Sequence, residues 1–186
     1  ERIRIGTTIT LLALQHPITM AQGLATVDLL RGGRAEVAFG VGWLEGEFEA
    51  LGVDFHKRGR MSDEYLAAII ELWTKDVASF EGEFVSFRDV VLEPKPVQKP
   101  WLPIWMGGDS DGALKRAARF ATGWVTFLTQ PQDYPARLDF IKSQPEYKGG
   151  PFDLMHNALA EKIGEGHVSR GGDDRRTDRG RLLGAG

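Results

Sequence analysis

The sequence predicts an α/β fold with a parallel sheet, and three observations support this prediction. Strand-like runs alternate with helix-like runs along the chain of 186 residues. The first two strand-like runs are joined by a helix-like run, the connection that parallel neighbours need. The composition, 42% hydrophobic and 26% charged, is enough for one sizeable core. A complete (β/α)8 barrel takes roughly 250 residues, so this chain can hold about half of one, or a small open sheet.

The first elements form a strand–helix–strand unit. Residues 2–12 are rich in β-branched side chains and are predicted to form a buried strand. His16-Pro17 opens a helix with proline at its first position, and the Arg-Gly-Gly run at 31–33 ends it. Residues 35–41 are the next predicted strand.

The middle of the chain carries helices and an inserted hairpin. Residues 44–52 form a short helix or loop, and residues 61–74 form a helix for which Ser62 is the expected N-cap. Residues 79–87 are predicted to form a β-hairpin with Gly82 in the turn. Prolines then make an extended approach to the next strand, at positions 94, 96, 100 and 103.

The segment 101–119 is the most informative in the chain. An apolar run at 102–106 ends in Gly107-Gly108, and the polar pair Asp109-Ser110 precedes a helix with one small apolar face. This order predicts a strand, a tight glycine turn and a helix N-terminus, where free backbone N–H groups and the helix dipole favour a phosphate. The alternative is a βα turn that binds nothing.

The last third of the chain predicts two more strands and a tail. Residues 123–127 and 152–160 are the strands. From about residue 165 the chain is polar and rich in glycine and arginine, so residues 1–164 are expected to form the folded segment and 165–186 a disordered or non-native tail. We therefore expect an internal piece of a larger domain.

Composition also excludes several functions. The net charge of −3 does not suggest a nucleic-acid or membrane partner, and no apolar run reaches transmembrane length. There is no cysteine, hence no disulfide framework and no thiolate site. We expect a cytoplasmic protein. No metal-ligand spacing appears around His56, His156 and His167.

Several short motifs, taken in their order, give the chain a family resemblance. It resembles the bacterial-luciferase-like family, whose members use flavin or the deazaflavin F420, from residue 2 to about residue 127. The motifs are Arg4-Ile-Gly-Thr-Thr8, His16-Pro17, Ala21, Leu24-Ala-Thr-Val-Asp28, Gly32-Gly-Arg34, Gly40-Val-Gly-Trp43, Glu47-Phe-Glu-Ala-Leu-Gly52, Arg58-Gly-Arg60, Glu64-Tyr65, Leu72-Trp73, Pro94-Lys-Pro-Val-Gln98, Pro103-Ile-Trp-Met-Gly-Gly108 and Gly123-Trp124.

The resemblance implies a TIM barrel, of which this chain holds about strands three to six or seven. The family site lies at the carboxyl ends of the strands, as in other barrels. A small-molecule substrate and a homodimer are expected. Gly107, Gly108, Asp109 and Ser110 match the element that holds the cofactor phosphate.

The same resemblance assigns the first strand a place behind the cofactor ring. Thr7, Thr8 and Ile9 match the strand where F420-dependent members carry a bulge with a non-prolyl cis peptide, expected here between Thr8 and Ile9. The alternative is a regular buried strand.

Other candidates follow the fourth and sixth barrel strands. Gly42 would let the ring approach the backbone, and Trp43 would line the substrate pocket or serve only in packing. Glu45 matches a proton-donating carboxylate, a role that needs burial, and an exposed helix glutamate is the alternative. Thr126 and Phe127 are the candidates for cofactor contact at the sixth strand.

The predicted function is that of a luciferase-like oxidoreductase. The first version uses reduced F420 and transfers hydride to or from a small organic substrate beside Glu45. The alternative version is an FMNH2-dependent monooxygenase. Two alternatives in which the chain catalyses no reaction also stay open. The chain is then either a truncated or scaffold fragment that is catalytically silent, or a module that binds phosphorylated ligands.

Overall fold

In a computed structural model of the chain, residues 3–156 are described. The predicted tail at 165–186 lies outside the described residues, as do the last four residues of the strand predicted over 152–160.

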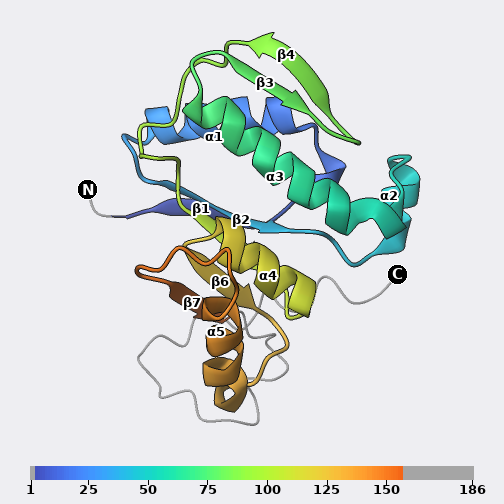
Figure 1. The fold of residues 1–186 in the computed structure, drawn as a ribbon, viewed down its shortest axis with the longest axis vertical. Helices are drawn as coiled ribbons and strands as arrows, with labels where there is room; N and C mark the ends of the chain where they lie inside the picture. Colours follow the sequence, from blue (N-terminus) through green and yellow to red (C-terminus); the bar gives the residue numbers. More distant parts are fainter. Residues whose placement is uncertain (1–2, 157–186) are drawn as a thin grey trace, which may run out of the picture.

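Five strands form a parallel sheet, which confirms the predicted fold class (Figure 1). The strands are β1 (Ile5–Leu11), β2 (Ala35–Gly40), β5 (Ile104–Gly107), β6 (Gly123–Thr126) and β7 (Asp153–His156), in the order β1-β2-β5-β6-β7. Every neighbouring pair is parallel. Within the described residues the sheet is open, with β1 and β7 as its outer strands.

Helices form where the sequence predicts them, with one boundary corrected, and one further helix, over residues 134–142, was not predicted. They are α1 (Pro17–Leu30), α2 (Glu45–Ala50), α3 (Arg58–Thr74), α4 (Asp111–Phe120) and α5 (Tyr134–Lys142), with 3-10 turns η1 (Leu12–Leu14), η2 (Phe55–Lys57) and η3 (Pro131–Asp133). The expectation that Ser62 caps the third helix is wrong. Asp54 caps η2 by accepting from the His56 N–H (2.9 Å), and η2 runs directly into α3 at Arg58. Ser62 therefore lies buried inside α3.

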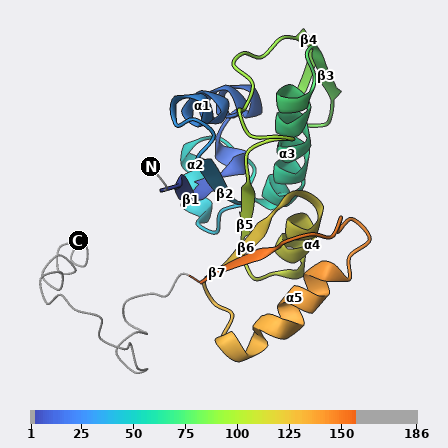
Figure 2. The same cartoon turned by 90° about the vertical axis from the view of Figure 1, so that its left-hand side faces the viewer.

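The core lies between one face of the sheet and the helices (Figure 2). Because strand side chains alternate between faces, every second residue of the central strands points to the helices. These residues are Val37, Phe39, Ile104, Met106 and Trp124, and all are fully buried. They pack with the apolar stripes of the helices, among them Leu66, Ile69, Leu72, Trp73, Leu114 and Ala117.

The opposite face of the sheet is less covered, and this corrects the prediction of a buried first strand. Residues 5–8 of β1 are exposed because β1 is an outer strand of the sheet.

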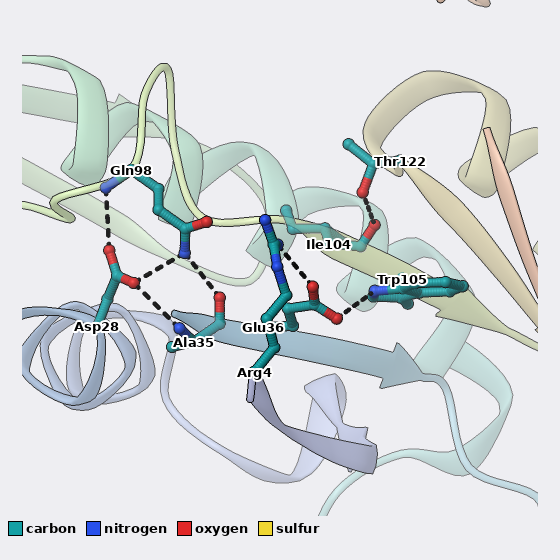
Figure 3. Close-up of polar contacts among 8 residues, drawn as sticks. All are labelled: Arg4, Asp28, Ala35, Glu36, Gln98, Ile104, Trp105 and Thr122. Carbon is teal, nitrogen blue, oxygen red and sulfur yellow. Dashed lines mark hydrogen bonds and ion pairs between the residues drawn. The ribbon is translucent and has the colours of Figure 1, made fainter. Parts of the chain in front are cut away.

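The amino ends of the strands are linked by Glu36. Its Oε1 pairs with Arg4 Nη1 (2.6 Å), and its Oε2 accepts from Trp105 Nε1 (3.1 Å; Figure 3). A Cβ on Gly123 would come within 2.5 Å of the Trp105 ring, so glycine is needed there.

The predicted hairpin is present and docks on α3. Its strands β3 (Ala78–Glu81) and β4 (Ser86–Val90) are antiparallel. The Glu64 carboxylate of α3 accepts from three successive N–H groups of the turn, those of Glu83, Phe84 and Val85, at 2.7–2.9 Å. A Cβ on Gly82 would lie 2.2 Å from Glu64 Oε1, so the contact requires a glycine in the turn.

A buried carboxylate joins three segments of the chain at the amino edge of the sheet (Figure 3). Asp28 of α1 is fully buried and accepts from the Ala35 N–H (3.3 Å), the Gln98 N–H (3.0 Å) and Gln98 Nε2 (2.8 Å). Gln98 Nε2 also donates to the Ala35 carbonyl (2.7 Å). These bonds join the end of α1, the start of β2 and the proline-rich segment.

Candidate functional site

The candidate residues gather at the carboxyl edge of the sheet because all five strands run in the same direction. The turn after β5, the turn after β6 and the loop after β2 all leave this edge, and Thr7 to Ile9 lie toward it along β1. In parallel α/β sheets this edge is where ligands bind.

The glycine pair at the end of β5 provides space rather than two amide donors. The Gly108 N–H donates to the Val125 carbonyl (3.1 Å), so it is already used within the sheet. Gly108 has φ +117, and a Cβ there would lie 3.0 Å from the Cβ of Ala113. A Cβ on Gly107 would lie 2.1 Å from Ile9 Cδ1. The two glycines therefore permit a close approach of β1 and of α4 to this turn.

The helix that follows the glycines keeps unused donors at its N-terminus. Ser110 is the N-cap of α4, and its Oγ accepts from the Ala113 N–H (3.3 Å), which leaves the hydroxyl hydrogen free to be donated. No described residue accepts from the N–H of Asp111 or Gly112, the first two residues of the ten-residue helix. These groups, with the positive end of the helix dipole, suit a phosphate.

The neighbouring acidic side chains are both engaged elsewhere. The Asp109 carboxylate accepts hydrogen bonds from the turn after β6, including the Thr129 N–H (3.1 Å). Asp111 Oδ1 pairs with Arg137 Nη1 of α5 (3.4 Å). Asp109 thus lies at the predicted place, but its carboxylate accepts hydrogen bonds from the turn after β6 and has no hydrogen to donate to a phosphate.

The environment of Asp109 lowers the pKa of its carboxyl group. Burial alone would raise this pKa, but hydrogen bonds donated by the hydroxyls of Thr126 and Thr129 and by the backbone of Phe127 and Thr129 together outweigh it. A carboxyl whose folded pKa is depressed stabilises the fold above its unfolded pKa, about 4 for aspartate.

The lowered pKa of Asp109 predicts that the free energy of unfolding of the wild type and that of Asp109→Asn differ by an amount that depends on pH. The variant should be less stable at pH 7, and the difference in the free energy of unfolding should shrink as the pH falls below about 4, because the unfolded wild-type chain then binds a proton at Asp109 that the folded chain, with its lower pKa, does not yet bind. Urea denaturation of both proteins at several pH values between 7 and 3 measures it. A difference that stays constant over this range would contradict the assignment.

The first strand carries the predicted irregularity. The peptide bond between Thr8 and Ile9 is cis, and the pairing of β1 with β2 shifts between Thr8 and Thr10, so the expectation of a bulge at this place is confirmed. Thr7 Oγ1 and Thr10 Oγ1 are hydrogen-bonded at 2.7 Å. The Ile9 side chain lies against β2 and β5: its Cγ2 is 2.7 Å from where a Gly40 Cβ would stand. A role behind a cofactor ring stays a prediction.

The described residues do not form an enclosed site around the candidates that follow β2, which are Gly42, Trp43 and Glu45. Gly42 has φ +84, and a Cβ there would meet the Phe48 ring at 2.7 Å, so packing already accounts for this glycine. Trp43 is 83% exposed. The Glu45 side chain is 54% exposed at the start of α2, with His56 Nε2 at 3.7 Å. The burial that a general acid needs is not provided here.

The candidates at the end of β6 belong to one hydrogen-bonded turn. Thr126 is fully buried and donates its hydroxyl to Asp109, while Phe127 is half-buried and its N–H faces Asp109 Oδ2 (3.4 Å). Thr129, which sequence reasoning missed, donates both its hydroxyl and its N–H to the same carboxylate.

A tyrosine–histidine pair next to this turn was also missed. Tyr134 Oη lies 2.6 Å from His156 Nδ1, at the carboxyl end of β7. Burial, and then the charge of Asp109, raise the pKa of Tyr134, so its phenol stays protonated at neutral pH. His156 pairs with Thr126 in the register between β6 and β7. The two residues are far apart in the sequence, so their proximity is known only from the strand pairing.

Residues 3–156 contain no cluster of three or more His, Cys, Asp or Glu side chains able to hold a metal ion. None of their helices combines the length and apolar character needed to cross a membrane.

Comparison with known proteins gives one family and several relatives. A family model described as luciferase-like monooxygenase matches residues 1–159. An FMNH2-dependent dimethylsulfone monooxygenase from Pseudomonas putida is 35% identical over 146 residues, which cover 77% of this chain and 40% of that protein. A phthiodiolone/phenolphthiodiolone dimycocerosates ketoreductase from Mycobacterium kansasii is 29% identical over 163 residues, covering 86% of this chain and 44% of that protein.

A solved structure also resembles the fold. The monooxygenase RslO1 from Streptomyces bottropensis superposes with a TM-score of 0.74 at 25% identity, over 83% of this chain and 49% of that one. The chain thus spans about half the length of the proteins it matches.

Proposed function

Since the chain belongs to the luciferase-like monooxygenase family, we propose that it forms the cofactor-phosphate part of an oxidoreductase acting on a small organic substrate. Its open sheet is then part of a (β/α)8 barrel of the luciferase-like type. The proposed cofactor is a reduced, phosphate-bearing flavin or deazaflavin.

One observation carries this proposal: the unused donors at the N-terminus of α4. The N–H groups of Asp111 and Gly112 and the hydroxyl of Ser110 converge on the carboxyl edge of the sheet, and the two flanking carboxylates are already bonded to other groups. A phosphate there would meet donors and the helix dipole without an opposing free carboxylate. The residues present therefore fit the group that the family uses.

We place FMN first and F420 second, which reverses the order predicted from the sequence. The Pseudomonas putida relative, named as FMNH2-dependent, supports the monooxygenase version. The Mycobacterium kansasii relative is named as a ketoreductase, and the reduction of a ketone is a two-electron transfer of the kind expected for F420. When bound, reduced FMN supplies electrons that activate oxygen, whereas reduced F420 supplies a hydride.

The chain's own residues would bind and orient the cofactor in both versions. Ser110, Asp111 and Gly112 would hold its phosphate, while Ile9 and the turn at Thr126 and Phe127 would flank it. Trp43 and Glu45 stay candidates for substrate contact and proton donation. A homodimer and a cytoplasmic location also stay predictions.

The test is to titrate the 186-residue chain separately with FMN and with F420 while measuring the cofactor's fluorescence. We expect saturable quenching by at least one of them, and competition by inorganic phosphate. Binding of FMN alone supports the monooxygenase version, and binding of F420 alone the reductase version. A folded chain that binds neither would contradict the proposal and favour a catalytically silent fragment.

A further inference from the structure

The turns after β5 and β6 are joined by a single carboxylate. Asp109 accepts hydrogen bonds from the hydroxyls of Thr126 and Thr129, from the Thr129 N–H at 3.1 Å, and from the N–H groups of Phe127 and Leu128 at 3.4 Å. Three successive backbone amides and two hydroxyls thus converge on one side chain from the neighbouring strand's turn.

Burial and additional bonds make this junction rigid. Thr126 and Thr129 are buried, and the Thr126 Oγ also accepts from the Thr129 N–H (3.1 Å). On the β5 side, Gly108 is held at both of its polar groups by β6: its N–H donates to the Val125 carbonyl (3.1 Å) and its carbonyl accepts from Trp124 Nε1 (2.8 Å). The backbone that leads into Ser110 is therefore fixed relative to Phe127.

We propose that Asp109 is a positioning residue that locks the turn at residues 126–129 against the N-terminus of α4, so that the phosphate-binding amides and Phe127 keep one relative placement. The part of this inference that concerns a cofactor rests on the proposed function. Asp109 acts through the two turns and makes no contact with the phosphate, which its negative charge would repel.

The electrostatics of the carboxylate agree with this role. Its pKa lies below the ordinary value because the turn's donors outweigh burial, so the acceptor stays ionised at neutral pH. Asparagine at this position would place an NH2 group against these donors. Among the described residues only the Thr129 N–H has a second acceptor, Thr126 Oγ (3.1 Å), so the turn at residues 126–129 would lose its attachment to Asp109.

The chain offers a closely matched control in Glu64. Its carboxylate also accepts from three successive backbone amides, those of Glu83, Phe84 and Val85, but in the hairpin on α3. Asp109→Asn and Glu64→Gln therefore remove the same kind of interaction at two places, only one of which adjoins the α4 N-terminus.

The experiment measures two quantities on the full chain. The first is amide hydrogen exchange without cofactor: Asp109→Asn should speed exchange at residues 127–129 at least tenfold and leave residues 83–85 unchanged, and Glu64→Gln should do the reverse. The second is affinity for FMN and for F420 well below the unfolding temperature: Asp109→Asn should weaken it at least tenfold, and Glu64→Gln less than twofold.

Each other outcome has a defined meaning. Unchanged exchange at residues 127–129 in Asp109→Asn overturns the inference, and so does unchanged affinity where the wild type binds. A loss of affinity without faster exchange would make Asp109 a direct ligand and also overturn it. If the wild type binds neither cofactor, the proposed function fails and the exchange result alone decides the inference.

A milder variant covers the case in which Asp109→Asn does not fold. Thr129→Val removes one hydroxyl donor and keeps the N–H and the side-chain volume. It should speed exchange at residues 127–129 about threefold to tenfold and weaken cofactor binding in the same direction. An unchanged exchange rate at residues 127–129 would contradict the proposed role of Asp109.

Discussion

Asp111→Pro should bind the proposed cofactor about 10- to 100-fold more weakly than Asp111→Ala. Proline has no N–H, so the substitution removes one of the unused donors at the N-terminus of α4. A hydrogen bond to a charged group contributes about 1.5–3 kcal/mol, and about 1.4 kcal/mol corresponds to a tenfold change in affinity. The comparison with alanine cancels the loss of the carboxylate and of its exposed ion pair with Arg137.

The local backbone makes proline acceptable at this position. Asp111 is the first residue of α4, the position where proline is favoured in helices. The preceding Ser110 has φ −77 and ψ 154, the extended conformation that a residue before proline prefers. Helix α1 already uses this arrangement, with Pro17 first and an extended His16 before it. The variant should therefore fold normally.

Two measurements decide this prediction. Circular dichroism and the urea midpoint should show that Asp111→Pro and Asp111→Ala are equally folded, and fluorescence titration with FMN and F420 gives the affinities. Alanine should bind at least as tightly as the wild type because a negative charge near the phosphate is gone. Equal affinities of the two variants would show that this amide does not hold the phosphate.

The architecture was predictable because it depends on patterns local in sequence. The helical crossover between residues 5–11 and 35–40 required parallel strands, and Gly107-Gly108 before Ser110 marked the start of α4. The boundary of α3 was missed because a 3-10 turn capped by Asp54, and not a serine, sets it. The burial of β1 was missed because exposure depends on which strands flank it and not on its own side chains.

The site was predictable in position but not in role. Sequence places Asp109 beside the glycine turn, yet only the β5–β6 register shows that its carboxylate receives the turn at residues 126–129. Gly42 was assigned to cofactor approach, whereas Phe48, six residues later, already fills that space. Tyr134 and His156 come together across a strand and a helix, a contact of 22 residues' separation that no local motif signals. Such roles depend on side-chain direction across neighbouring elements.

The largest loss of stability is expected from Asp28→Ala, at the opposite edge of the sheet. Alanine would leave the Ala35 N–H, the Gln98 N–H and one hydrogen of Gln98 Nε2 without their acceptor, beside a position that is fully buried (Figure 3). Each unsatisfied buried donor costs about 1–3 kcal/mol, so the free energy of unfolding should fall by about 3 kcal/mol or more.

Asp54→Ala provides the matched control for this loss. Asp54 also accepts a backbone N–H, that of His56 at 2.9 Å, but its side chain is exposed, so water can replace it. Its loss should cost about 1 kcal/mol or less, the usual range for a cap. Urea denaturation with an unchanged slope measures both variants. Similar losses for the two would mean that the proline-rich segment relaxes to satisfy its own donors, and that Asp28 does not hold this edge of the sheet together.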